Sequence, residues 1–137
     1  MENSVFRQII GVVAGVVVGG AIVFITELVG HSAFPPPAGT DLSNPDHIAR
    51  LIDSLPIGAF VMVLAGWFLG SLAGALVANR IARNTLAGWI VAVLFILLTA
   101  YNFTVIPHPV WMMAAGVALP LVAAWIAGQP RWSPDRA

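Results

Sequence analysis

The chain has 137 residues, of which 59% are hydrophobic and 9% charged, and its formal net charge is zero. Soluble domains carry charge on roughly a quarter of their residues, so this composition excludes an ordinary soluble domain and predicts one integral membrane domain over residues 1–137. The charged residues include no lysine, which leaves no basic surface for nucleic acid, and the absence of cysteine excludes disulfides and thiolate-bound metals.

The first membrane span is predicted over residues 9–30. From Ile9 to Thr26 there are 18 residues without a charge, about the length at which an apolar run is interpreted as a span rather than a core helix. Three glycines of this run, Gly11, Gly15 and Gly19, recur at four-residue spacing, and Gly20 directly follows the last of them. Small residues at this spacing let a second helix approach closely, so the sequence predicts a helix-packing surface here.

Residues 31–55 are predicted to form a loop outside the membrane. Three consecutive prolines after Phe34 exclude a helix at its start. The run Asn44-Pro45-Asp46 then has the residues of a helix start, and apolar residues follow at i, i+3, i+4 and i+7. This pattern predicts a short amphipathic helix that lies on the membrane surface or caps the bundle.

Three further spans are predicted over residues 56–79, 86–106 and 110–127. The second span repeats the four-residue spacing of small residues, at Gly66, Gly70 and Gly74. The fourth contains Pro120, which removes one helical hydrogen bond. With the first span they predict an all-α membrane protein, an antiparallel bundle of four transmembrane helices with the short amphipathic helix in the first outer loop.

The arginines predict the orientation of the bundle. Four spans place both termini and the link between spans two and three on one side, which then holds five of the six arginines; the other side holds only Arg50. Positively charged residues favour the cytoplasmic side. We therefore expect a multi-pass protein of a bacterial inner membrane with both termini in the cytoplasm.

One acid lies inside a predicted span, and it leads to the candidate site. Glu27 precedes His31 by one helical turn, and all three histidines fall on the predicted outer side. Carboxylate and imidazole groups are ligands of zinc-like divalent ions, so one interpretation is a metal site. The candidate ligands are Glu27, His31, His47 and His108.

Two other interpretations of this polar face stay open. In one, Glu27 binds a proton or a ligand together with Tyr101 and Asn102, because a carboxylate inside a membrane segment is costly and commonly functional. In the other, these side chains are only interfacial polar groups. No cofactor other than a divalent metal is expected.

The sequence favours a non-enzymatic interaction or accessory subunit that contacts lipid and either a second copy or a membrane-protein partner. The first alternative is a proton- or divalent-cation-linked transporter or channel that uses Glu27 and His31 with Asn102 and His108. The second is an intramembrane enzyme of unknown substrate, but no serine stands in a nucleophile motif and no HExxH run occurs. No catalytic residue is therefore assigned.

Overall fold

The computed structural model describes residues 2–41 and 43–129, and all regular structure in these ranges is helical. The five helices are α1 (Glu2–Ala33), α2 (Pro45–Ser54), α3 (Ile57–Ala82), α4 (Leu86–Val105) and α5 (Val110–Ala127). Four of them, α1, α3, α4 and α5, are long and apolar enough to cross a membrane. The composition and these four helices together indicate a membrane protein.

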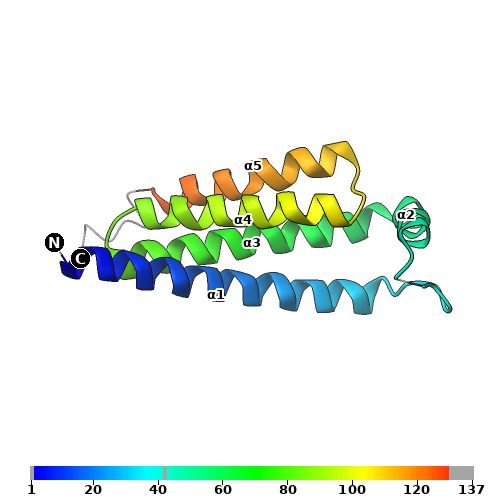
Figure 1. Ribbon diagram of the computed structural model, residues 1–137, viewed down its shortest axis with the longest axis horizontal. Coiled ribbons are helices and arrows are strands. Elements are labelled where there is room, and N and C mark those ends of the chain that lie inside the picture. Colours follow the sequence, from blue (N-terminus) through cyan, green and yellow to red (C-terminus); the bar gives the residue numbers. More distant parts are fainter. Residues whose placement is uncertain (1, 42, 130–137) are drawn as a thin grey trace.

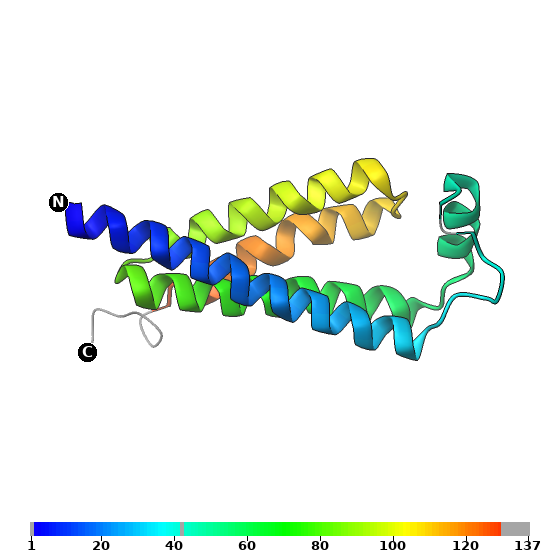
Figure 2. The same ribbon diagram turned by 60° about the horizontal axis from the view of Figure 1, so that its bottom comes forward.

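The four long helices lie side by side, and α2 stands beyond one end of them (Figure 1). We call this the α2 end. The start of α1 and the short connection between α3 and α4 lie at the opposite end, the α3–α4 end (Figures 1 and 2). Helices α3 and α4 each contact the other three long helices, and the largest contact of the bundle is that between α1 and α3.

Helices α1 and α3 contact each other through glycine along much of their length. A Cβ atom on Gly15 would lie 2.5 Å from the carbonyl oxygen of Gly74, and a Cβ atom on Gly19 would lie 2.5 Å from that of Gly70. Any side chain at these positions would overlap the backbone of the neighbouring helix. Glycine is therefore what allows the two backbones to approach this closely.

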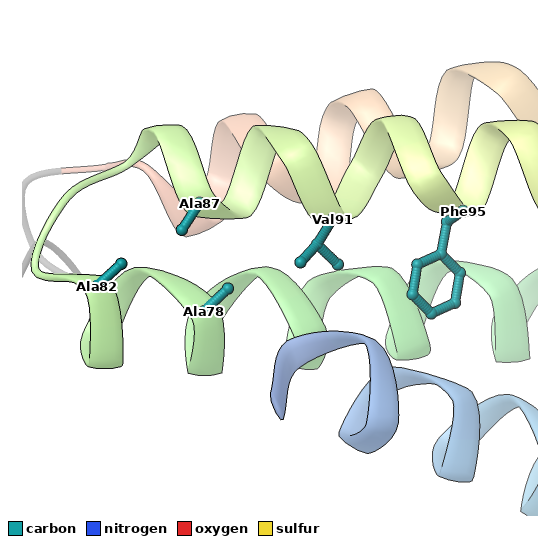
Figure 3. Packing of buried hydrophobic residues seen from close by; sticks show 5 residues of the cluster. All are labelled: Ala78, Ala82, Ala87, Val91 and Phe95. Carbon is teal, nitrogen blue, oxygen red and sulfur yellow. The ribbon is translucent and has the colours of Figure 1, made fainter. Parts of the chain in front are cut away.

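Small side chains also fill the contact between α3 and α4. Ala78 and Ala82 of α3 pack with Ala87, Val91 and Phe95 of α4 in one buried cluster (Figure 3). Four of these five side chains are alanine or valine, so the helices come close at the α3–α4 end. The only large ring of the cluster, Phe95, lies nearest the α2 end (Figure 3).

Two helices are longer than the membrane spans predicted from the sequence, and a polar contact joins their ends. Helix α1 begins at Glu2 rather than near residue 9, and α3 continues to Ala82 rather than ending at residue 79. Arg7 Nη2 donates a hydrogen bond to the carbonyl oxygen of Ala82 (3.1 Å), an acceptor that the end of α3 leaves without a helical partner. The polar start of α1 is thereby held against the end of α3.

Helix α2 begins as the sequence indicates. Asn44 is its N-cap residue, and its side-chain oxygen accepts a hydrogen bond of 2.9 Å from the backbone N–H of Asp46. Pro45 occupies the first helical position, where its missing N–H costs nothing. The cap sets the start of the helix.

Candidate functional site

A cavity of about 250 Å³ lies between α1, α3 and α4. It extends from Val16 and Phe95 toward the α2 end as far as Glu27 and Asn102, where α4 diverges from α1 (Figure 2). We call it the lateral groove. Its lining comes from α1 (Val16, Gly20, Val23, Phe24, Glu27), α3 (Trp67) and α4 (Phe95, Leu98, Thr99, Asn102).

Glu27 is the only charged side chain of the lateral groove. It is exposed, and within the described residues its carboxylate makes no hydrogen bond and no ion pair. It lies eight residues from Gly19, about 12 Å along the helix. If the Gly19–Gly70 contact marks the middle of a hydrocarbon core about 30 Å thick, Glu27 lies just inside its boundary, where an unpaired charge is unfavourable.

The groove contains one glycine with open space beside it. A Cβ atom on Gly20 would meet no atom within 4 Å, whereas the Cβ position of the neighbouring Gly19 is 2.7 Å from the ring of Phe95. Within the described residues, Gly20 therefore does not contact a neighbouring helix. Its backbone is accessible from the groove.

The groove brings together two of the three residues predicted to bind a proton or a ligand. Asn102 and Glu27 line it from opposite walls, with Thr99 beside Asn102. Tyr101 is not part of the lining, and 70% of its surface is exposed. The tyrosine therefore lies on a different face of α4.

Glu27 also borders a second, smaller cavity of about 100 Å³ at the α2 end. His31 and Phe34 line this cavity from the end of α1, and Leu55 lines it from the segment between α2 and α3. Glu27 and His31 thus share a cavity, but no hydrogen bond or ion pair joins them among the described contacts. Glu27 is the residue that lines both cavities.

The other two histidines lie apart from Glu27. His108 Nδ1 is 2.7 Å from the carbonyl oxygen of Ile106, and its ring centroid lies 5.2 Å from that of Phe103 and 6.2 Å from that of Trp67. His47 borders a third cavity, between the proline-rich loop and α2. Across residues 2–41 and 43–129, no three His, Asp or Glu side chains are grouped so that they could hold a metal ion. The four predicted ligands are thus not gathered at one point.

One buried polar residue was not singled out by the sequence. Asn79 of α3 is 1% exposed; its Oδ1 accepts a hydrogen bond from the backbone N–H of Gly88 (2.7 Å), and its Nδ2 donates to the carbonyl oxygen of Ala127 (3.2 Å). It therefore joins α3 to both α4 and α5. The sequence shows Asn79 only as an asparagine at the end of a predicted span. Because polar residues at such positions commonly face the lipid headgroups, this did not indicate a buried role.

The arrangement gives the groove one defined chemistry, with apolar and aromatic walls, an accessible glycine backbone and a single carboxylate. Among the described residues of the lining, Thr99 carries the only hydroxyl and Glu27 the only carboxylate, and no hydrogen bond joins the two. Comparison of the chain with protein-family models, with curated proteins and with solved structures finds no match.

Proposed function

We propose that this chain is a non-enzymatic interaction or accessory subunit, an antiparallel four-helix bundle in a bacterial inner membrane with both termini in the cytoplasm. In this proposal a glycine zipper between α1 and α3 holds the bundle, and the lateral groove receives a transmembrane helix of a partner protein. The distribution of arginines supports the orientation. The short helix α2 then lies at the outer surface of the membrane.

The observation that carries the proposal is the open space at Gly20. Glycines of α1 on the α3 side are in contact with a helix backbone, whereas Gly20 has nothing within 4 Å of its Cβ position and borders a cavity. In lipid, helices associate where small residues allow close backbone approach and where polar groups find partners. On the α1 wall of the groove, Gly20 is such a small residue and Glu27 is such a polar group.

Two adjacent residues of α1 offer a matched test of docking. Phe24 lines the groove and is 60% exposed, while Ile25 does not line it and is 58% exposed. A photoreactive benzoylphenylalanine at position 24 should crosslink to one transmembrane segment of one other protein in native membranes. At position 25, which lies at nearly the same depth, the same group should crosslink only to lipid.

Identification of the crosslinked segment by mass spectrometry completes the test. The same protein must co-purify with the wild-type chain and be lost with Gly20→Leu, whose new side chain fills the groove. Lipid adducts alone at position 24, or identical products at both positions, would refute helix docking. An adduct to a second copy of this chain would assign the groove to a homo-oligomer instead.

A second function is favoured by one observation, the position of Glu27 between two cavities. A carboxylate that borders both spaces can pass a proton or bind a cation between them, which would make the chain a proton- or cation-linked transporter or channel. Purified protein in vesicles that enclose a pH-sensitive dye tests this role. A proton flux that Glu27→Gln abolishes would support it, whereas an equal flux in the variant would remove Glu27 from the pathway.

A further inference from the structure

We infer that the helix received by the lateral groove carries a lysine or arginine that pairs with Glu27, seven residues from the small residue that contacts Gly20. This inference rests on the proposed docking function and specifies the chemistry of the partner. Three features of the groove lead to it: its unpaired charge, the placement of this chain's own cations, and the spacing of Gly20 and Glu27.

The negative charge of Glu27 in the groove favours a positively charged partner. Glu27 has no hydrogen bond or ion pair within the described residues, and the other polar groups of the lining, Thr99 and Asn102, are neutral. With the Gly19–Gly70 contact at the middle of the hydrocarbon core, Glu27 lies near the core's boundary, and an anion there gains from a partner of opposite charge. The long apolar stem of lysine or arginine fits between walls that include Phe24 and Phe95, with its charged end at the carboxylate.

None of the described arginines supplies that cation; the nearest basic side chain, His31 one turn along α1, borders the smaller cavity with Glu27 but does not line the lateral groove. Arg7 bonds to Ala82, Arg80 and Arg83 lie at the α3–α4 end, and Arg50 lies on α2, where it donates to the carbonyl oxygen of Asp46 (3.3 Å). A second copy in the same orientation would place Arg7, Arg80 and Arg83 at the α3–α4 end, away from Glu27, and Arg50 on α2 beyond the α2 end. The observations therefore favour a different protein over a homodimer.

The spacing along α1 sets the spacing in the partner. Gly20 and Glu27 are seven residues apart, which is two helical turns and about 10.5 Å on one face. A partner helix that crosses α1 at a small angle and contacts Gly20 through a small residue reaches Glu27 two turns later. The partner thus carries a small residue and a basic residue at i and i+7 on the face that it presents.

Synthetic helices test this inference on the whole chain. Because the chain contains no lysine, an amine-reactive donor dye labels only its amino terminus, and energy transfer to an acceptor-labelled peptide can be measured in phosphatidylcholine vesicles. The probes are leucine-rich transmembrane peptides with one glycine and, seven residues away, either lysine or norleucine. A third peptide places the lysine on the opposite face.

We expect the i, i+7 lysine peptide to bind wild type roughly tenfold or more tightly than either control peptide. Glu27→Gln should abolish this preference while it leaves the thermal unfolding of the chain unchanged. Equal binding of the three peptides to wild type, or a lysine preference that survives in Glu27→Gln, would overturn the inference.

Gly20→Leu separates this inference from the docking function itself. If it weakens binding of the norleucine and lysine peptides equally, and wild type shows no lysine preference, the groove binds helices but not through charge. If no peptide responds to Gly20→Leu, helix docking itself fails. An unchanged melting temperature of both variants is required, so that loss of binding reports the groove rather than unfolding.

Discussion

The backbones of Gly15 and Gly74 meet in the contact between α1 and α3. A Cβ atom on Gly15 would lie 2.5 Å from the carbonyl oxygen of Gly74, and one on Gly74 would lie 2.6 Å from that of Gly15. The contact is thus reciprocal, and it involves rigid backbone atoms rather than a side chain that can rotate away. The close approach of these two helices depends on both residues.

Gly15→Ala should therefore lower the free energy of unfolding by about 1–3 kcal/mol, because the added methyl group forces α1 and α3 apart. Gly20→Ala is the matched control, since its methyl group enters open space; we expect no loss of stability there. Thermal unfolding in detergent, followed by circular dichroism, measures both. Equal melting temperatures of the two variants would contradict this account of the contact.

Asn79→Ala should destabilise the junction of α3, α4 and α5 by about 1–3 kcal/mol, because it leaves the buried N–H of Gly88 and carbonyl of Ala127 without their side-chain partner. The loss of the hydrogen bond can be observed at one group, the backbone N–H of Gly88. Hydrogen exchange at Gly88 should become faster in the variant than in wild type. Unchanged exchange at Gly88 would show that the bond to Asn79 does not protect it.

Arg83 ends α3 in the left-handed conformation, with φ 54° and ψ 38°. A side chain costs about 1 kcal/mol in this region and glycine does not. Arg83→Gly should therefore be more stable than Arg83→Ala by about 1 kcal/mol, although both variants lose the same charge. The order of their melting temperatures tests this; a more stable alanine variant would be inconsistent with the strained conformation.

Ser71 lies fully buried in α3, and its hydroxyl has no hydrogen-bond partner among the described residues. Burying an unpaired hydroxyl costs about 1–3 kcal/mol, so Ser71→Ala should raise stability by about 1 kcal/mol. Ser32→Ala is the control, because the Ser32 hydroxyl is exposed and bonds to the carbonyl oxygen of Leu28 (2.9 Å). A loss of stability in Ser71→Ala would mean that the hydroxyl is paired in the membrane.

Asp41 lies in the loop before α2, where its carboxylate accepts hydrogen bonds from the Ser43 hydroxyl (2.6 Å) and the Ser43 backbone N–H (2.9 Å). These bonds favour the charged form and lower the pKa of Asp41 below its usual value, with the hydroxyl as the larger cause. The turn is therefore stabilised above the pKa that Asp41 has when unfolded. This contribution is lost as the pH falls through the lowered pKa.

Ser43→Ala should raise the pKa of Asp41 toward its usual value, because it removes the hydroxyl donor and leaves the backbone N–H. Titration of the Asp41 side-chain carbon by nuclear magnetic resonance measures the shift in both proteins. The same pKa in wild type and variant would show that the hydroxyl does not stabilise the carboxylate.

The sequence by itself determined the features that depend on neighbours along the chain. Apolar length predicts the four long helices, which the structure has as α1, α3, α4 and α5, because a helix satisfies its own backbone hydrogen bonds wherever lipid surrounds it. The start of α2 at Asn44 and Pro45 is local in the same way, since the cap bonds only two residues away. The tendency of glycines four residues apart to share a face also follows from helical geometry.

Only the tertiary structure decided which of these faces meet. Gly19 is covered and Gly20 is open because α1 is rotated so that one of them faces α3 and α4, and the period of glycines does not set this rotation. Glu27 and Asn102 are 75 positions apart, and their place in one groove depends on the angle at which α1 and α4 diverge. His108 packs against Trp67 and Phe103 instead of approaching Glu27 for the same reason: side-chain packing between helices, rather than sequence spacing, determines which polar groups come together.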